Sequence, residues 1–391
     1  MTYDALFARR TLGVRPGLVA VRGVFEALGS PASGSPAIHV VGTNGKGSIA
    51  AMAEHALRHR GHRTGLFTSP HLQRVTERVR IDGAEVDDTV LEAAIATVLS
   101  REDLSEERER PLSFFEVLTV AALLVFEQAG VDTLVVEAGL GGRLDSTRLV
   151  DAKAVAVGRI DLDHQAYLGD TLQEIAAEKA GVFRDRAPVF SVPQHPAAWA
   201  VLERAAWNAP CPLRRPEPID APLPGEHQRY NAAVALAAAQ HLDPSVTEVD
   251  LDGTTWPARL ERRPAGRGEW VLDVAHNPAS MAALATALDT LPPADTLVLV
   301  ACSADKDAAA LAQALVGVGE CWTLEDASLG LAPLPGARLF EGVDDARLEP
   351  ALRAHAEAGG RVVVCGSHRL VGAAMGAWLS DGERPDPSDP R

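Results

Sequence analysis

The chain has 391 residues, which is long enough for two domains with well-buried cores. Its net charge of −16 argues against a nucleic-acid partner, because no basic stripe is present to neutralise phosphates. No apolar run in the sequence approaches membrane-spanning length, and the first residues lack a signal-peptide layout. The four cysteines have no metal-ligand spacing and are expected to be reduced thiols, so we expect a cytoplasmic protein without a membrane partner.

Short apolar strands alternate with helical segments in the first half of the chain, which predicts a parallel sheet. The expected strands are 38–41, 63–67, 133–137, 155–160 and 188–192. Helices are expected near 48–60, 88–99, 115–129 and 172–180. Thr171 and Glu174 have the spacing of a capping box at the start of the last helix. The charged run 101–110 is expected to be a solvated helix end or loop.

The same alternation restarts after a less regular region. A proline-rich surface stretch over 208–224, a helix over 225–241 and a linker over 243–257 are expected first. Strands 270–274, 296–301 and 361–365 then alternate with helices 279–290, 307–316 and 369–379. We therefore predict an α/β protein with a mainly parallel sheet in a domain over 1–250, a smaller α/β domain over 251–380, and a disordered tail over 381–391.

A glycine-rich loop, Gly42–Ser48, follows the first strand and leads into a helix. Glycines allow backbone N–H groups to converge on an anion, the helix N-terminus adds partial positive charge, and Lys46 adds a full charge. The pattern departs from G-x-x-x-x-G-K-[ST], because Gly47 separates Lys46 from Ser48. The loop predicts a phosphate cradle, and a glycine turn without a ligand is the alternative.

Reactive side chains follow the ends of successive strands. Ser69 follows the second strand, Glu137 ends the third, and Asp161, Asp163 and His164 follow the fourth. In an open parallel sheet, ligands bind beyond the carboxyl ends of the strands. Hydroxyl, carboxylate and imidazole groups around a triphosphate are suited to coordinating Mg²⁺.

Each of these residues also has a purely structural interpretation. Ser69 could only cap the turn before a proline, and Glu137 could pair with Arg143. His164 could be an ordinary loop histidine. Lys179 lies near the end of its helix, where on sequence alone a role in complementing the helix dipole is favoured.

The second domain contains the segment Asp273–Pro278. Asn277 and Pro278 form a natural N-cap and N1 pair, so these two have a structural explanation. Asp273 and His276 lie at the carboxyl end of a strand and have no capping role. A site that draws on both domains requires closure to assemble it, which suits a reaction that must exclude water.

In combination these motifs resemble the folylpolyglutamate synthase/dihydrofolate synthase family, within the Mur ligase superfamily. The resemblance extends over nearly the whole chain, from Gly42 to about Gly372. The segments that carry it are Gly42–Ser48, Ser69–Leu72 with Glu77 and Arg78, Ser113–Glu116, Glu137–Asp145, Asp163–His164 with Leu168 and Gly169, Glu178–Gly181, His227–Gln228 with Asn231, Arg259–Glu261, and Asp273–Pro278. The resemblance implies an N-terminal P-loop ATPase domain and a smaller, Rossmann-like C-terminal ligase domain.

The resemblance also implies a reaction. ATP phosphorylates a carboxylate of a pterin compound, and the amino group of L-glutamate attacks the resulting acyl phosphate. The implied small-molecule partners are dihydropteroate or a reduced folate, L-glutamate and ATP, and the expected state is a monomer. The implied cofactors are ATP, two Mg²⁺ ions, an N6-carboxylysine at Lys179, and room for a monovalent cation.

Residue roles carry over from the family by position. The resemblance assigns Gly45, Lys46, Gly47 and Ser48 to the phosphates of ATP, and Thr43 and Asn44 to the binding of this cofactor. It assigns Asn231, Arg259 and Asp273 to the nucleotide, Ser69, Glu137 and His164 to Mg²⁺, and Ser113, Phe114, Phe115, Glu116 and Asp145 to the pterin. It assigns catalytic roles to Lys46, Lys179 and His276, with a carbamylated Lys179 placing the second Mg²⁺ and His276 near the glutamate or the transferred phosphate.

Three positions depart from the family pattern. Ala166 stands where an aspartate is frequent, Ala258 where a glycine is usual, and Arg148 where asparagine is common. Ala166 and Arg148 lie on the expected substrate side, so they leave the substrate preference open. We expect a bifunctional enzyme, and a folylpolyglutamate synthase without the dihydropteroate activity is the alternative.

Two rival functions are less consistent with the sequence. A cell-wall Mur ligase usually carries an extra N-terminal nucleotide-sugar domain, and only 41 residues precede Gly42 in this sequence. A phosphate-loop switch protein would not need the segment Asp273–His276, and the guanine-reading motif N-K-x-D is absent from the sequence.

Overall fold

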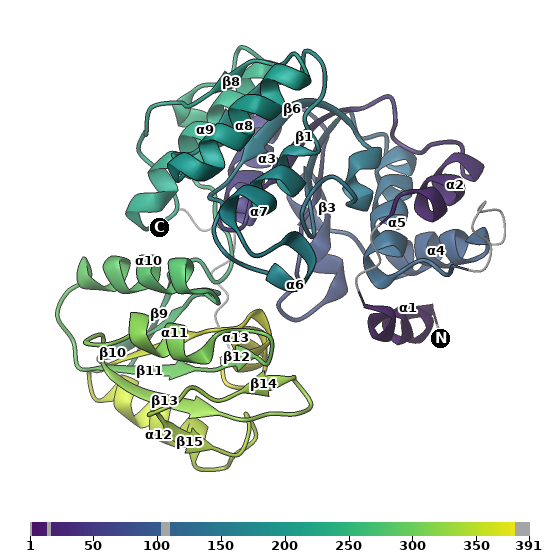
Figure 1. The fold of residues 1–391 in the computed structure, drawn as a ribbon. Coiled ribbons are helices and arrows are strands. Elements are labelled where there is room, and N and C mark those ends of the chain that lie inside the picture. Colours follow the sequence, from purple (N-terminus) through teal and green to yellow (C-terminus); the bar gives the residue numbers. More distant parts are fainter. Residues whose placement is uncertain (1, 14–16, 103–109, 380–391) are drawn as a thin grey trace. The chain divides into compact units, whose positions relative to one another are not determined.

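The computed structural model describes residues 2–13, 17–102 and 110–379. It divides into two compact units. The first unit comprises Met1–His71, Val75–Leu223 and His227–Trp256, and the second comprises Leu72–Arg74, Pro224–Glu226 and Pro257–Arg391. Each unit contains its own sheet, which confirms the predicted α/β fold class with a large parallel-dominated sheet and a second, smaller one (Figure 1).

The sheet of the first unit has eight strands in the order β4-β3-β2-β5-β1-β6-β7-β8. Their bounds are β1 Pro36–Val41, β2 Thr64–Phe67, β3 Val79–Ile81, β4 Ala84–Glu85, β5 Thr133–Glu137, β6 Asp151–Val157, β7 Val189–Ser191 and β8 Leu213–Arg214. Among these strands, the pairs β2–β3 and β3–β4 are antiparallel, and the other neighbouring pairs are parallel. Strand β1 lies between β5 and β6 and pairs parallel with both, so the carboxyl ends of the three strands lie next to one another.

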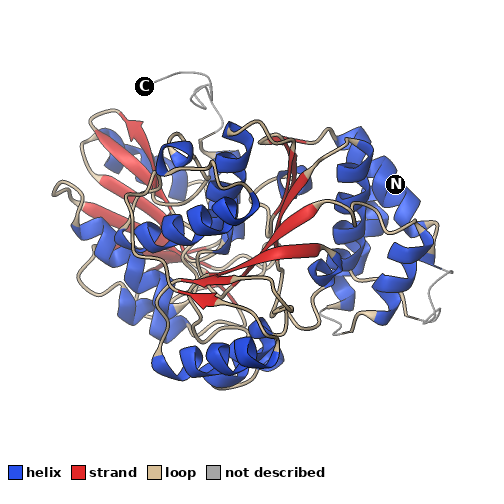
Figure 2. Cartoon of the chain, turned by 90° about the horizontal axis from the view of Figure 1, so that it is seen from above, coloured by secondary structure: helices blue, strands red, loops and turns tan. Residues whose placement is uncertain are grey.

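Helices cover both faces of this sheet (Figure 2). One face packs against α3 (Lys46–His59) and α9 (Glu226–Leu242). The other packs against α1 (Thr2–Ala8), α2 (Val19–Ala27), α4 (Asp88–Leu99), α5 (Phe114–Gln128), α7 (Leu172–Ala180) and α8 (Pro196–Asn208). The core-facing stretches of α3 and α5 are rich in Ala, Val, Leu and Ile, and their burial contributes to the stability of the unit.

The second unit has a six-stranded sheet in the order β15-β13-β11-β16-β10-β9. Its strands are β9 Glu261–Ala265, β10 Gly268–Leu272, β11 Thr296–Val300, β13 Glu320–Leu324, β15 Arg338–Phe340 and β16 Arg361–Cys365, and a small separate pair is formed by β12 Cys302–Ser303 and β14 Leu331–Ala332. Helices α10 (Pro278–Asp289) and α11 (Ala308–Ala314) pack on one face, and α12 (Leu348–Glu357) and α13 (His368–Ala377) pack on the other. Only the edge strand β9 is antiparallel, which is the layered arrangement of a Rossmann-like unit.

Two predicted helix starts are confirmed. Thr171 and Glu174 form the capping box at the start of α7. Asn277 caps α10, with Pro278 at its first position. The structure corrects the fourth expected strand, because β6 covers Asp151–Val157 and not 155–160. Most of the charged run 101–110, and the predicted tail 381–391, lie outside the described residues.

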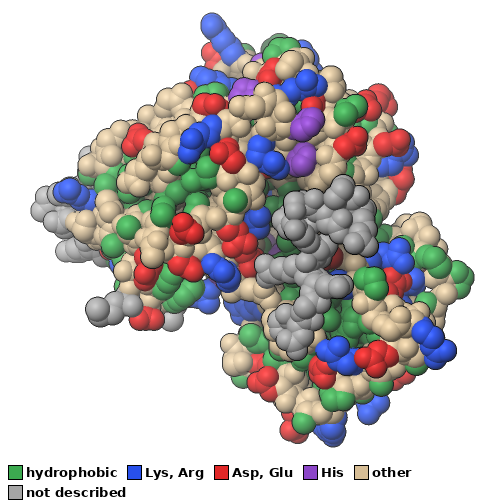
Figure 3. Space-filling model, turned by 180° about the vertical axis from the view of Figure 1, so that it is seen from behind, with side chains coloured by type: hydrophobic (Ala, Val, Ile, Leu, Met, Phe, Trp, Pro, Cys, Tyr) green, Lys and Arg blue, Asp and Glu red, His purple; other side chains and the backbone are tan. Residues whose placement is uncertain are grey.

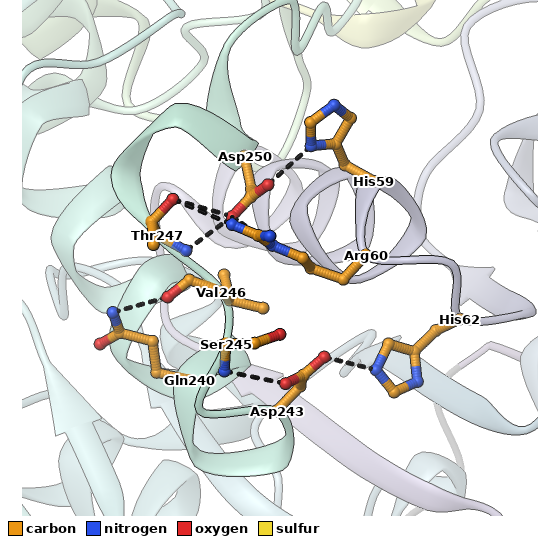
Figure 4. A network of polar contacts seen from close by, with 9 residues as sticks. All are labelled: His59, Arg60, His62, Gln240, Asp243, Ser245, Val246, Thr247 and Asp250. Atoms are coloured by element: carbon orange, nitrogen blue, oxygen red, sulfur yellow. Dashed lines mark hydrogen bonds and ion pairs between the residues drawn. The ribbon is translucent and has the colours of Figure 1, made fainter.

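The expected linker over 243–257 is partly ordered against the first sheet's helix α3. It contains the short 3-10 helix η5 (Glu248–Leu251), and the predicted domain boundary at residue 250 falls within it. Asp250 accepts hydrogen bonds from Arg60 Nε at 2.8 Å and from the Thr247 N–H at 2.6 Å, and it pairs with His59 Nδ1 at 2.6 Å (Figure 4). His62 pairs with Asp243 at 3.0 Å in the same corner. These contacts attach the segment to the carboxyl end of α3.

The Asp250 carboxylate should make the stability of this corner pH-dependent. Its burial opposes ionisation, but the bonds from His59, Thr247 and Arg60 hold its pKa well below the usual range. Its contribution is therefore present above the pKa of an unfolded aspartate, near 4, and is lost as the pH falls below that value. We expect Asp250→Asn to lower the stability of the first unit by about 1–3 kcal/mol at pH 7 and by less at pH 3.

Urea unfolding of parent and variant at both pH values measures this difference. Asp252→Asn is the matched control, because Asp252 lies two residues away with an exposed side chain. An equal loss for Asp250→Asn at pH 7 and pH 3 would contradict the ionic origin of the effect.

Acidic and basic side chains are interspersed over the face drawn in Figure 3. Within the part of the chain that the structure describes, no helix combines the length and apolar character needed to cross a membrane.

Candidate functional site

The glycine-rich loop leads from β1 into α3, and its conformation exposes the N-terminus of that helix. Gly45 has a φ of 84°, in the left-handed region, and α3 begins at Lys46. Within the helix, Ile49 N–H donates to Gly45 O. The N–H groups from Gly45 to Ser48 lie at the N-cap and in the first turn, where no earlier helical carbonyl is available to them, so they form an end that can bind an anion.

The first part of the loop is fixed to the segment that follows β6. The N–H groups of Thr43 and Asn44 both donate to Arg159 O, at 2.8 and 3.0 Å. Asn44 Nδ2 donates to Asp161 Oδ2 at 3.0 Å. Thr43 and Asn44, which were predicted to bind the ATP cofactor, therefore direct their backbone donors toward Arg159 and position the loop.

Two glycines permit this close approach. A Cβ on Gly158 would lie 2.4 Å from the carbonyl oxygen of Asn44. A Cβ on Gly42, whose φ is 148°, would lie 3.0 Å from Gly158 Cα. Neither contact leaves room for a side chain, so the loop and the end of β6 interlock through these two positions.

Glu137, at the carboxyl end of β5, lies beside the loop and is 3% exposed. Its Oε2 accepts the N–H of Ser69 at 3.0 Å, and its Oε1 is 3.9 Å from Lys46 Nζ. The structural alternative, a pair with Arg143, is not formed, because Arg143 pairs with Glu178 at 2.7 Å. The structure thus brings together the predicted metal ligands Ser69 and Glu137 with the predicted phosphate-binding Lys46.

Lys179 approaches the same loop from α7. It is 3% exposed, and its Nζ donates to Gly42 O at 2.9 Å. Burial and the neighbouring charge of Lys46 lower its pKa to about 7, although Asp163 acts in the opposite direction. A large fraction of the amine is therefore neutral near pH 7, and the side chain faces the loop rather than solvent at its own helix end.

His164 lies in the segment after β6, at the start of the short helix α6 (Gln165–Leu168). Its φ is 51°, its side chain is 42% exposed, and its Nε2 is 4.0 Å from Asp163 Oδ1. Across residues 2–13, 17–102 and 110–379, no three His, Cys, Asp or Glu side chains gather as a metal-binding group. Mg²⁺ is held in proteins by a few side chains together with phosphate and water oxygens, so a site at Glu137 does not require such a group.

Helix α9 contacts the opposite side of the loop. Gln228 donates to the buried Ser48 hydroxyl at 3.2 Å, and Asn231 donates to Gln228 at 2.9 Å. A Cβ on Gly45 would lie 2.7 Å from the Asn231 side chain. Asn231, predicted to contact the nucleotide, is thus in place beside the loop, and Gln228 orients the Ser48 hydroxyl.

The segment Ser113–Glu116 starts α5. The Ser113 hydroxyl and the Glu116 carboxylate form a reciprocal capping box, and Arg110 pairs with Glu116 at 2.9 Å. The polar groups of these two predicted pterin residues therefore fix the helix start. They orient Phe114 and Phe115, and the Phe115 ring lies 5.6 Å from that of Phe67 and covers Gly139.

Asp145 is buried and binds the chain around it. It accepts from the N–H groups of Leu140 and Thr147, both at 2.9 Å, and from the Thr147 hydroxyl. Burial raises its pKa, and these hydrogen bonds oppose the rise. On the other side of Thr147, the buried His39 of β1 contacts the hydroxyl at 2.9 Å, and burial with Arg184 and Arg148 lowers the pKa of this histidine to about 3. His39 was missed because a histidine inside an apolar strand carries no motif.

His71 and Arg78, which belong to the family-like segments but were given no role, form a second polar group in the first unit. Arg78 Nε donates to His71 Nδ1 at 2.9 Å. Burial, with Arg78 and Arg10, lowers the pKa of His71 to about 3, so this ring is neutral.

In the second unit, Asp273 and His276 organise the loops around β10. Asp273 accepts the N–H groups of Leu260 and Ala275, each at 2.8 Å. His276 Nδ1 lies 2.7 Å from Val274 O, and its ring is 5.3 Å from that of His368. Arg259 lies between Ala258 and Leu260, which both have positive φ, and the Asp273–Leu260 bond holds this turn.

We expect Asp273→Ala to weaken both this turn and nucleotide binding. Two backbone donors lose a charged acceptor, so the second unit should be destabilised by about 2–4 kcal/mol. Thermal unfolding and titration with a non-hydrolysable ATP analogue measure the two effects. Asp273→Asn is the matched variant, because it can still accept from one donor. Unchanged analogue affinity in Asp273→Ala would contradict the predicted nucleotide role.

The C-terminal unit identifies the class of protein. Residues 258–368 match the family model of the Mur ligase glutamate ligase domain. This match places the C-terminal unit in the Mur ligase superfamily, and the parallel sheet of the first unit is consistent with it.

The chain belongs to the folylpolyglutamate synthase/dihydrofolate synthase family. It is 32% identical to the folylpolyglutamate synthase of Lacticaseibacillus casei, over 80% of each chain. It is 33% identical to a probable bifunctional folylpolyglutamate synthase/dihydropteroate synthase of Haloferax volcanii, over 95% of this chain but only 50% of that longer relative.

Solved structures support the same family. The fold matches Mycobacterium tuberculosis folylpolyglutamate synthase complexed with ADP and AMPPCP, with a TM-score of 0.88, 28% identity and coverage of 98% of this chain and 100% of that one. It also matches a bifunctional folylpolyglutamate synthase/dihydrofolate synthase with Mn, AMPPNP and L-glutamate bound, with a TM-score of 0.84, 30% identity and coverage of 96% and 97%.

Proposed function

We propose that this chain is an ATP-dependent amide ligase that adds L-glutamate to dihydropteroate and to the glutamate tail of reduced folates. The observation that carries the proposal is the buried Glu137 carboxylate, placed between the Ser69 N–H and Lys46 at the mouth of a phosphate loop. The ATP analogues, manganese and L-glutamate bound to the related structures support ATP, a divalent metal and glutamate as ligands here.

The chemistry requires activation of a carboxylate, because direct attack by an amine would have to expel oxide. The carboxylate oxygen attacks the γ-phosphorus of ATP, and ADP leaves. The neutral amine of glutamate then attacks the carbonyl carbon of the acyl phosphate, inorganic phosphate leaves, and the nitrogen loses a proton to solvent. Lys46 and the N–H groups from Gly45 to Ser48 would stabilise the phosphate charge in the first step.

Ser69, Glu137 and His164 would hold Mg²⁺, and a carbamylated Lys179 would support a second ion. Bound Mg²⁺ would polarise the γ-phosphate and neutralise developing charge. The neutral fraction of Lys179 supports carbamylation, since only an unprotonated amine adds CO₂.

The remaining roles stay predictions. They include the nucleotide contacts of Asn231, Arg259 and Asp273, and the role of His276. The pterin contacts of Phe114, Phe115 and Asp145 also stay predictions. The same is true of the monovalent cation, the monomeric state and the cytoplasmic location.

A product assay by mass spectrometry tests the proposal. Purified protein is incubated with ATP, Mg²⁺ and L-glutamate, and with either 7,8-dihydropteroate or tetrahydrofolate monoglutamate. Addition of glutamate to both acids is the expected result. Addition to tetrahydrofolate alone would leave a folylpolyglutamate synthase. ATP hydrolysis without any adduct would overturn the proposal and favour muropeptide substrates or a nucleotide switch.

A further inference from the structure

Arg78 is a buried cation with unused hydrogen-bond donors. It ends the 3-10 helix η2 (Val75–Arg78), and the residue is 8% exposed. Its Nε donates to His71 Nδ1, but its two terminal nitrogens have no hydrogen bond or ion pair with any residue that the structure describes. Burial and Arg10 lower its pKa to about 10, so the group is still charged at neutral pH.

Such an arrangement opposes stability, because a buried guanidinium normally needs a carboxylate or carbonyl groups to offset its lost hydration. His71 accepts one hydrogen bond but adds no negative charge. The terminal nitrogens of Arg78 still reach solvent. Among the described residues, the terminal nitrogens of Arg78 do not belong to the fully enclosed polar side-chain atoms that lack a hydrogen bond. The Arg78 guanidinium is thus held in place by His71, and its two terminal nitrogens can donate hydrogen bonds to an external ligand.

Aromatic rings line this charge. The guanidinium carbon of Arg78 is 5.2 Å from the centre of the Phe114 ring, and that of Arg10 is 5.1 Å from the same ring. Phe114 in turn stacks on Phe7, with 5.9 Å between ring centres. A planar aromatic acid offers a surface for stacking on these rings and a carboxylate that an arginine fork can bind through two hydrogen bonds.

The Arg78 guanidinium also lies near Glu137, at the carboxyl end of β5. His71, which anchors Arg78, is two residues beyond Ser69, and Ser69 donates to Glu137. Burial and Arg10 lower the pKa of Arg78, and the nearby carboxylates of Glu137 and Glu77 partly oppose this. A carboxylate bound by Arg78 would therefore lie on the side of the unit where the phosphate loop and Glu137 are found.

We propose that Arg78 is the binding residue for the reacting carboxylate of the acid substrate, held in place by His71 and flanked by Phe114. The phosphates of ATP have their own donors in the loop from Gly45 to Ser48, and the aromatic surroundings of Arg78 fit dihydropteroate, whose reacting carboxylate is on a benzene ring, better than a phosphate. This inference rests on the proposed ligase function.

Equilibrium binding of 7,8-dihydropteroate and tetrahydrofolate monoglutamate, without ATP, tests the proposal. We expect Arg78→Met to weaken the binding of both acids about 30-fold or more. The affinity for a non-hydrolysable ATP analogue should not change. Arg78→Lys keeps the charge but loses the fork, so it should also bind both acids more weakly than the parent.

Thermal unfolding separates this role from a structural one. Removing an uncompensated buried cation should leave the melting temperature of Arg78→Met unchanged or raise it. Arg80→Met is the matched control, because Arg80 is bonded to Glu85 and to Gly83 O within the protein. The control should lose stability and retain its affinity for both acids.

Three results would overturn the inference. Full affinity for both acids in Arg78→Met, with a lowered melting temperature, would make Arg78 structural. Lost affinity for tetrahydrofolate alone would assign Arg78 to a carboxylate that does not react, because dihydropteroate has only the reacting one. Failure of the unsubstituted protein to bind either acid would overturn the proposed function, and this inference with it.

Discussion

Replacing Glu137 with glutamine should reduce turnover by about a thousandfold or more while the protein remains folded. The side chain is buried, and its Oε2 accepts the Ser69 N–H at 3.0 Å, a bond that a glutamine carbonyl can also accept. What the substitution removes is the negative charge beside Lys46, and with it the carboxylate that would bind Mg²⁺. Rates of ADP release with saturating glutamate and acid substrate measure the effect.

A second readout connects the loss to the metal. A metal–nucleotide complex that binds only the folded protein raises its melting temperature. Mg²⁺ should add to the stabilisation by AMPPCP in the parent and add little in Glu137→Gln. Glu54→Gln is the matched control, because Glu54 is also 3% exposed but is bonded to Thr64 and Arg58. Wild-type turnover in Glu137→Gln would exclude Glu137 as a metal ligand.

Replacing Lys179 with arginine should abolish turnover as well. Arginine keeps a positive charge but cannot add CO₂, and a buried guanidinium does not lose its proton. Because the pKa of Lys179 is lowered to about 7, its neutral form increases as the pH rises through 7. The activity of the parent should therefore rise over the same range and depend on bicarbonate.

Chemical rescue provides the stricter test of the carbamate. Lys179→Ala should recover part of its activity when formate or acetate supplies the missing carboxylate, and ¹³C-bicarbonate should give a carbamate signal in the parent only. Lys153→Arg serves as the control, because Lys153 is exposed and pairs with Asp151. Full activity in Lys179→Arg would refute carbamylation.

The central strands were predicted from sequence because their burial on both faces gives continuous apolar runs, as in β1 and β5. The short strands β3, β4 and β8 were missed, since strands of two or three residues leave no period to detect. Helix α8 was also missed, although His195 caps it and Pro196 stands at its first position. The error at β6 has a physical cause, because Ile160 extends the apolar pattern past Gly158, where the chain already turns toward the phosphate loop.

The sequence predicted that Lys46, Ser69 and Glu137 lie close together, because each lies at the carboxyl end of a parallel strand. The sequence could not predict how backbone donors are used, such as the N–H groups of Thr43 and Asn44 that both donate to Arg159 O. Arg78 belongs to one of the family-like segments, but the sequence does not show that its terminal nitrogens lack a hydrogen-bond partner among the described residues. Such a property exists only in three dimensions.

The close contact between Gly42 of the phosphate loop and Gly158 after β6 affects how the effects of substitutions at these positions are interpreted. Gly42 and Gly158 carry no functional group, yet an added methyl at Gly158 would collide with the Asn44 carbonyl at 2.4 Å. In a saturation mutagenesis screen scored by growth, both positions should be as intolerant as Lys46. Intolerance alone would then mark them as catalytic, whereas their constraint is steric. A variant-effect map of this loop must therefore be interpreted by contact geometry before it is interpreted as chemistry.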